Sequence, residues 1–143
     1  DGSALVGRKV KQQPADLEWV IFPATPISKE PLGPTYGQND SVWADVINWT
    51  VYATIIMDEY GIGSSNVDDH VNDPGEVGRL LGGEGELQTV MGLSADAFYQ
   101  VIKQVGNYSE IYNSNLNPVG LVREGSANAG WLDGGLIYAP PAR

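Results

Sequence analysis

The chain has 143 residues, a formal net charge of −10, no cysteine and a single histidine, and its length suits one domain of ordinary size. The acidic balance argues against binding of nucleic acid or of an anionic membrane surface, because each phosphate contact requires a cation. The missing cysteines exclude disulfides, thiolate catalysis and cysteine-based zinc sites, and the single histidine argues against a histidine-based triad.

The N-terminal residues predict a helix that is already under way. Residues 1–10 are helix-compatible, and Asp1 or Ser3 supplies a short side-chain oxygen for the N-cap. Pro14 disfavours continuation of this helix. A natural domain seldom begins on a helix cap, so we expect the sequence to be a piece of a longer protein.

A strand and an extended connection are expected next. Residues 17–22 form a short apolar run with β-branched and aromatic side chains, which is typical of a strand. The prolines that follow predict an extended connection over residues 24–38. A lone strand leaves its N–H and C=O groups unpaired. We therefore expect its partner strand to come from missing chain or from another copy.

The strongest predicted helix covers residues 42–60. Asn39, Asp40 or Ser41 can cap its start, and Gly61 can end it in a left-handed conformation. Shorter helices separated by glycines are expected over residues 66–71, 74–81, 86–91, 95–105 and 108–116. Pro74 suits a first helical position and Ser94 suits an N-cap. The glycine-rich end of the chain loses periodicity, and residues 138–141 should be extended.

One group of side chains carries oxygen atoms of the kind that calcium prefers. Its members are Asn66, Asp68, Asp69, Asn72 and Asp73. The spacing is not that of an EF-hand loop, and such residues also cap short helices and occupy turns. We therefore favour a structural role and predict no metal or other cofactor.

Other candidate sites also have simpler interpretations. The glycine-rich residues 82–85 lack the lysine of a phosphate-binding loop, and their acidic neighbours would repel phosphate, so a turn is favoured. His70 has no evident nucleophile partner. An acid/base pair would require folding to bring together two of a set of glutamates, namely Glu59, Glu84, Glu86 and Glu110. No enzyme activity is predicted.

The aromatic residues could form a stacking platform for sugars or aromatic ligands. The candidates are Trp19, Trp43, Trp49 and Tyr52. Trp43 and Trp49 are six positions apart on the predicted helix and do not share one face. Packing in the core and hinge is the favoured interpretation, and Trp131 is expected to pin the C-terminal segment to its own lobe.

Six segments, in fixed order, resemble the C-terminal part of the bacterial general L-amino-acid-binding proteins, the periplasmic receptors of ABC importers. These segments are ISKEPLGP followed by SVWADVINWTVYATI, then SSNVD, RLLGGEGEL, VIKQVGNYSEIYNSNL and GWLDGGLIYAPPAR. The resemblance covers essentially the whole chain. It implies an α/β fold in which this chain is the C-terminal, predominantly helical part of a two-lobed periplasmic binding protein.

The resemblance also implies a division of the chain. Residues 1–22 would end the ligand-binding lobe two, residues 23–38 would form the hinge, and residues 39–143 would be the C-terminal helical part of lobe one. The family's first half, with most of the sheet, would be missing. The implied partners are an L-amino acid, an ABC permease of the inner membrane, and the missing half or another copy of the chain, with no nucleic acid.

Asp1 is the one ligand-binding residue that the resemblance implies. The aspartate of the matching turn in the family accepts the α-ammonium group of the ligand, an arrangement that charge-assisted hydrogen bonding favours. The alternative role for Asp1 is a helix N-cap. For the chain as a whole, the implied function is periplasmic amino-acid binding, and the alternative is a short self-associating structural protein without ligand-binding activity.

Overall fold

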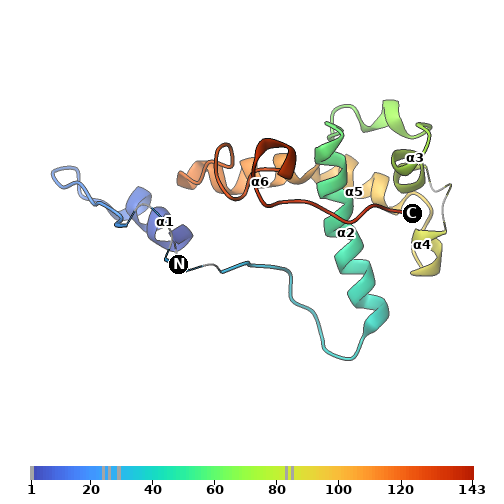
Figure 1. The fold of residues 1–143 in the computed structure, drawn as a ribbon, viewed down its shortest axis with the longest axis horizontal. Coiled ribbons are helices and arrows are strands. Elements are labelled where there is room, and N and C mark those ends of the chain that lie inside the picture. The colour runs from blue at the N-terminus through green and yellow to red at the C-terminus, as the bar shows by residue number, and fades with distance from the viewer. Residues whose placement is uncertain (1, 24, 26, 29, 83, 85) are drawn as a thin grey trace.

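The computed structural model describes residues 2–23, 25, 27–28, 30–82, 84 and 86–143. An N-terminal arm, residues 2–40, extends away from a helical body, residues 41–143 (Figure 1). The arm begins with α1 (Gly2–Gln12), whose last turn carries Lys9 and Lys11. Basic side chains at this position complement the negative end of the helix dipole. The predicted N-terminal helix is therefore confirmed.

The other described residues of the arm form no helix, and the strand predicted over residues 17–22 is wrong. Val20 and Phe22 are 78% and 89% exposed. A strand needs a neighbour to pair its backbone groups, and the described residues offer none. The Trp19 N–H instead donates to Gln13 Oε1 at 2.9 Å. In the predicted extended connection, residues 24–38, the described residues form no helix or strand and include bends at Thr25, Ile27 and Ser28.

The body is organised around α2 (Ser41–Glu59), the longest helix of the described chain. The Asp40 side chain caps it by accepting the Trp43 N–H at 2.9 Å. Its C-terminal half is buried and its N-terminal half is more exposed. Gly61 ends the helix with a φ of 68°, a conformation that glycine adopts at little cost. The predicted helix is thus confirmed, together with one of its three candidate caps.

Shorter helices follow α2 in the chain, and two of them, α5 (Ala97–Val105) and α6 (Tyr108–Leu116), pack against it (Figure 1). The shorter helices are η1 (Val67–His70), α3 (Glu76–Leu81), α4 (Leu87–Val90), α5, α6, η2 (Asn117–Val119) and η3 (Trp131–Asp133). Two predicted starts shift: α3 begins at Glu76, with Gly75 at its N-cap position, rather than at Pro74, and Asp96 rather than Ser94 is the N-cap position of α5. The Ser94 carbonyl accepts the Ala97 N–H in the preceding turn.

The core lies where α2, α3 and α5 meet. Phe98 and Ile102 of α5 are 1% and 0% exposed, and burial of a side chain of this size stabilises by about 1.5–3 kcal/mol. The buried cluster comprises Val46, Ala53, Ile56, Met57, Ile62, Val67, Val77, Leu80, Leu81, Met91, Phe98, Ile102 and Ala142. Every member belongs to the body, so the arm contributes nothing to this core.

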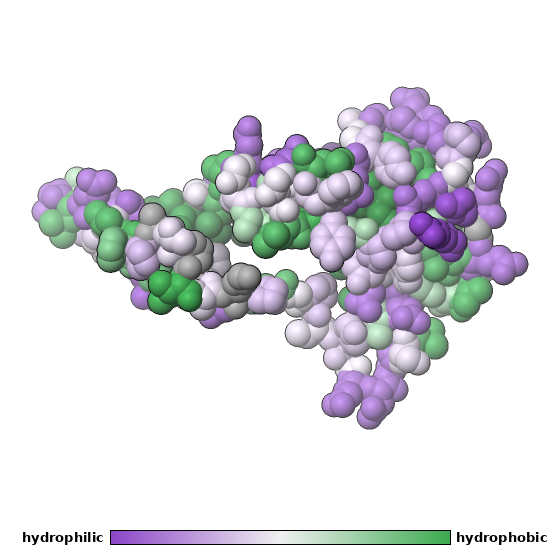
Figure 2. Space-filling model, in the orientation of Figure 1, coloured by the Kyte–Doolittle hydropathy of each residue, from purple (hydrophilic) through white to green (hydrophobic). Residues whose placement is uncertain are grey.

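The arm meets the body where α1 contacts η2. Val6 and Val10 lie beside Gly120, where an added Cβ would sit 3.4 Å and 3.5 Å from their methyl carbons. None of the residues of α1 is buried. Figure 2 shows hydrophobic side chains on the surface of the arm, at the left of the view. No helix among the described residues is long and apolar enough to cross a membrane.

The total accessible surface is large for the size of the chain. It amounts to 9558 Å² for 15.3 kDa, whereas a folded monomer of that mass exposes about 7,100 Å². The exposed apolar residues of the arm include Leu5, Val20, Phe22 and Leu32. The molecule therefore leaves surface uncovered that a self-contained domain would bury.

Candidate functional site

Asp1, the ligand-binding residue predicted from the resemblance, lies outside the described residues. The structure places the helix that follows it, because α1 begins at Gly2. The role of the Asp1 carboxylate remains a prediction.

Three side chains of the candidate calcium cluster, those of Asn66, Asp68 and Asp73, contact other neighbours. Asp68 accepts hydrogen bonds from Lys103 Nζ at 2.7 Å and from the Tyr99 hydroxyl at 2.9 Å. These hydrogen bonds lower the pKa of Asp68, and the bond from Lys103 makes the largest contribution. Asn66 Oδ1 accepts the Gly63 N–H. Among the described residues, no three histidine, aspartate or glutamate side chains gather as a metal site requires.

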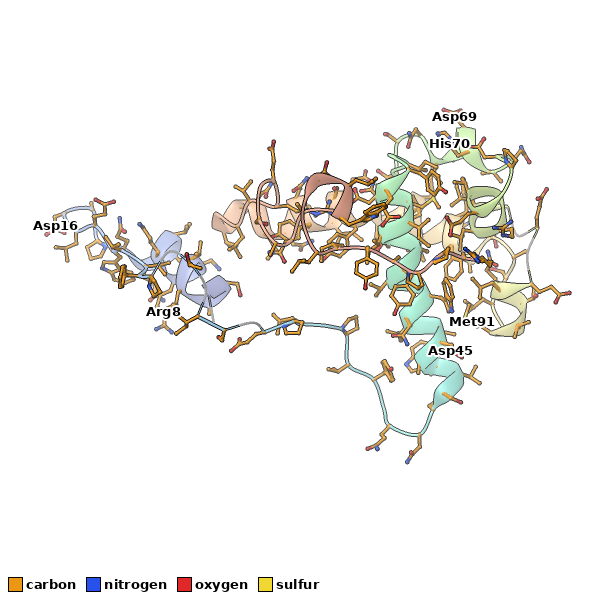
Figure 3. All side chains as sticks on the ribbon, in the orientation of Figure 1. Arg8, Asp16, Asp45, Asp69, His70 and Met91 are labelled. Atoms are coloured by element: carbon orange, nitrogen blue, oxygen red, sulfur yellow. The ribbon has the colours of Figure 1, made fainter. Side chains whose placement is uncertain are left out.

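His70 forms a local contact with Asp73. Its Nδ1 lies 2.7 Å from Asp73 Oδ2, within a single turn. His70 and Asp69 project from the η1 region at the top of Figure 3, and Asp16 lies at the far end of the arm. In the predicted glycine-rich turn, Gly83 and Gly85 lie outside the described residues. Gly82 packs against the Val71 carbonyl, which would stand 2.4 Å from an added Cβ.

Glu110 is held by a dense set of hydrogen-bond donors. Its carboxylate accepts the backbone N–H and the hydroxyl of Ser64 and the backbone N–H of Asn107, and Asn107 Oδ1 accepts the Glu110 N–H in return. Burial opposes ionisation, but the donated hydrogen bonds outweigh it and lower the pKa of Glu110. This capping box fixes the start of α6 and ties it to the turn after α2.

The fold brings Glu59 close to Glu76. Glu76 was not among the glutamates predicted from the sequence. Trp131 Nε1 donates to Glu59 Oε1 at 3.1 Å, and the Tyr60 hydroxyl donates to Glu76 Oε2 at 3.2 Å. The Ala142 N–H donates to Glu76 Oε1. Burial, and to a smaller extent the negative charge of Glu76, raises the pKa of Glu59. Glu84 and Glu86 are exposed and lie on a different groove.

Glu59 and Glu76 line a groove beneath the C-terminal segment, which we call the tail groove. It has a volume of about 430 Å³, and its walls include Ile56, Glu59, Glu76, Trp131, Tyr138 and Pro141. Its walls therefore combine carboxylate side chains with aromatic rings. No acid/base pair forms among the four predicted glutamates, because only Glu59 lies here.

The aromatic residues do not assemble into one platform. Trp49 and Tyr52 pack edge to face, with ring centroids 5.6 Å apart, against the core. Trp43 is 49% exposed on the same helix, and Trp19 lies on the arm. The predicted packing role is confirmed for Trp49 and Tyr52. Trp131 pins the C-terminal segment to α2 through Glu59, as expected.

Sequence reasoning missed a buried ion pair between α2 and the segment after α6. Arg123 Nη1 lies 2.6 Å from Asp58 Oδ2, and the two side chains are 10% and 15% exposed. Arg123 also donates to the Asn128 carbonyl and to the Ser109 hydroxyl, and its guanidinium lies 5.1 Å from the centre of the Tyr108 ring. Through these contacts Arg123 connects α2, α6 and the segment that follows α6.

Comparisons with known proteins give a consistent result. No protein-family model matches the chain. A putative amino-acid ABC transporter-binding protein of Escherichia coli, YhdW, is 40% identical over 149 residues, covering 100% of this chain and 42% of the relative. The general L-amino acid-binding periplasmic protein AapJ of Rhizobium johnstonii is 44% identical over 132 residues, covering 88% and 38%. The glutamate/glutamine/aspartate/asparagine-binding protein BztA of Rhodobacter capsulatus is 39% identical over 150 residues, covering 100% and 43%.

A solved structure agrees with these relatives. The chain superimposes on an ABC transporter periplasmic binding protein from Brucella ovis, determined with glutathione bound, with a TM-score of 0.84 and 37% identity. The match covers 100% of this chain and 45% of that structure. The resemblance and the fold class inferred from the sequence are therefore confirmed. The chain spans about two-fifths of the length of the relatives that it matches, and its helical structure agrees with part of a lobe.

Proposed function

We propose that this chain is the C-terminal part of the solute-binding component of an amino-acid ABC importer, which binds free L-amino acids in a cleft between two lobes. The observation that carries the proposal is the match over the whole chain, at 39–40% identity, to two amino-acid transport binding proteins. The relatives are transport proteins, so no chemistry on the ligand is required. AapJ and the Brucella structure are periplasmic proteins, which supports a periplasmic location.

The ligands named for these relatives share one chemical group. AapJ is named for L-amino acids, BztA for four of them, and the Brucella protein holds glutathione. Each of these ligands contains an α-ammonium group beside a carboxylate. An ionised carboxylate is a strong acceptor for such an ammonium group, and this supports the role proposed for Asp1. The helix N-cap is the alternative role.

The division into lobes is part of the proposal. Residues 1–22 would end lobe two, residues 23–38 would form the hinge, and residues 39–143 would belong to lobe one. The absence of helix from the described residues between α1 and α2 supports a hinge there. The contact of Val6 and Val10 with the backbone at Gly120 would then join the two lobes. Hinge closure around the ligand would precede docking to the permease.

The uncovered surface supports a requirement for more polypeptide. The accessible area exceeds that expected for a monomer by roughly 2,400 Å², whereas one side of a standard protein interface buries about 800 Å². The missing half of the binding protein would cover the exposed apolar side chains of the arm. A second copy of the chain could cover them instead, and the chain would then be a self-associating structural protein. Sedimentation at several concentrations distinguishes the two, because only self-association makes the mass depend on concentration.

Calorimetric titration tests the proposed function. L-glutamate, L-glutamine and L-alanine are titrated into the chain alone and into the chain joined to the remaining part of its binding protein. We expect heat of binding only from the joined protein. Asp1→Asn in the joined protein should weaken binding at least tenfold, because it removes the charge that faces the ammonium group. Saturable binding by the chain alone, or no binding by the joined protein, would overturn the proposal.

A further inference from the structure

We propose that the tail groove is a docking site for a polypeptide segment that presents an arginine or lysine side chain between apolar residues. The proposal does not depend on the function proposed above. It rests on the charge of the groove, on the lack of a basic partner for its carboxylates among the described residues, and on the apolar rim.

The groove holds two carboxylates whose hydrogen-bond donors are all neutral. Glu59 accepts from the Trp131 indole, and Glu76 accepts from the Tyr60 hydroxyl and the Ala142 N–H. These donors orient the carboxylates without cancelling their charge. Two negative charges therefore face one partly buried space, an arrangement that a cation would relieve.

The body has few basic side chains to supply that cation. Residues 41–143 contain 13 of the 18 acidic residues and only 4 of the 8 basic ones. Arg123 is paired with Asp58, Lys103 is paired with Asp68, and Arg79 donates to the Ala142 carbonyl. Within the described residues, neither Glu59 nor Glu76 forms an ion pair. Arg143 lines the other groove. We therefore expect a cation for the tail groove to come from polypeptide outside the described residues.

The exposed residues at the rim of the groove indicate which side chains should flank the cation in the partner. Trp131, Leu132, Leu136 and Tyr138 are 55–68% exposed. They belong to a loop closed by backbone hydrogen bonds, among them the Trp131 N–H to the Ile137 carbonyl at 2.9 Å and the Gly135 N–H to the Gly130 carbonyl at 3.0 Å. A loop fixed in this way offers apolar surface at little entropic cost. Aromatic faces also attract guanidinium and ammonium groups. A cationic side chain flanked by apolar ones matches both features.

The test uses a peptide and its neutral analogue. Acetyl-leucyl-arginyl-leucinamide is titrated into the isotope-labelled chain, and the indole N–H signal of Trp131 is followed by NMR after assignment with Trp131→Phe. We expect a saturable shift. The same peptide with citrulline in place of arginine keeps the shape and removes the charge, and it should bind at least tenfold more weakly.

Matched variants locate the contact. Glu59→Gln keeps an acceptor for Trp131 and should weaken the arginine peptide at least fivefold. Glu18→Gln makes the same change in net charge on the exposed arm and should leave affinity unchanged. Leu136→Ser alters only the exposed rim and should weaken the peptide but not free argininamide. Thermal unfolding of each variant checks that it is folded.

Four results would overturn the proposal. They are the absence of a shift at Trp131, equal affinity for the arginine and citrulline peptides, equal effects of Glu59→Gln and Glu18→Gln, and binding of argininamide as tight as that of the peptide. The last result would assign the groove to a small organic cation rather than to a polypeptide.

Discussion

Arg123 joins three parts of the body through one side chain. It pairs with Asp58 of α2, donates to Ser109 of α6, and donates to the Asn128 carbonyl of the C-terminal segment. Because both charges are nearly buried, the pair is sensitive to the loss of one partner. The arrangement was invisible in the sequence, since Asp58 and Arg123 lie 65 positions apart and nothing in their local context marks them.

Loss of Arg123 alone should destabilise the chain strongly. Arg123→Leu leaves the Asp58 carboxylate buried without a cation, and we expect the free energy of unfolding in urea to fall by about 3 kcal/mol. The double variant Asp58→Leu with Arg123→Leu removes both charges and should recover part of this loss. A single-variant loss below about 1 kcal/mol would show that Asp58 finds water or another donor.

Glu110 should link stability to pH in the acid range. Burial opposes ionisation of Glu110, but hydrogen bonds from Ser64 and Asn107 outweigh it and hold its pKa below the ordinary value of 4.5. Its ionised form therefore stabilises the fold at pH values above 4.5, and this contribution disappears as the pH falls through the lowered pKa. Glu110→Gln should reduce stability at pH 7 and flatten the acid loss measured by urea unfolding. An unchanged pH profile would contradict this assignment.

The pKa of Glu59 is shifted in the direction opposite to that of Glu110. Burial raises its pKa, so the folded chain binds this proton more tightly than the unfolded chain does. The contribution of Glu59 is favourable at low pH and is lost as the pH rises from 4.5 through the raised pKa. Glu59→Gln should therefore increase stability at pH 7 relative to the parent chain. A decrease would show that the hydrogen bond from Trp131 requires the charge.

At the level of elements, α2 depends on its cap more than on its surface charge. Asp40→Ala removes the acceptor of the Trp43 N–H and should cost about 1 kcal/mol in urea unfolding. Asp45→Ala is the matched control, because Asp45 is exposed in the same helix, near its N-terminal end (Figure 3). We expect this control to be neutral or slightly stabilising. Equal losses from both variants would show that the cap carries no special weight.

Helices bounded by local signals were the most predictable elements. The bounds predicted for α6, residues 108–116, are those observed, because Asn107 and Glu110 form a capping box within four residues. The strand over residues 17–22 failed because a strand requires a neighbour that lies elsewhere, and hydrophobic pattern alone cannot supply one. The tail groove was missed for a related reason. Glu59 and Glu76 belong to different helices, and only the fold brings them together.

For the molecule as a whole, the charge is concentrated in the body. Residues 41–143 carry a net charge of −9, and the arm is balanced. Self-repulsion of this kind opposes the compact state. Added salt screens it, since the Debye length falls from about 30 Å at 0.01 M to about 8 Å at 0.15 M.

The melting temperature should therefore rise with ionic strength. We expect an increase of several degrees between these two salt concentrations, followed by differential scanning calorimetry. Sodium chloride and choline chloride should give similar increases, because screening does not depend on the identity of the cation. A constant or falling melting temperature would show that the body compensates its acidic residues in another way.

The separation of arm and core has a consequence for the handling of the protein. Phe22, Ile27 and Leu32 are 83–89% exposed, and the described residues around them form no helix or strand. Such stretches are preferred sites of proteolytic nicking. Thermolysin, which cleaves before large apolar residues, should cut the chain there first and release α1. The remaining product should keep its melting transition, because every residue of the core lies beyond the cleavage points.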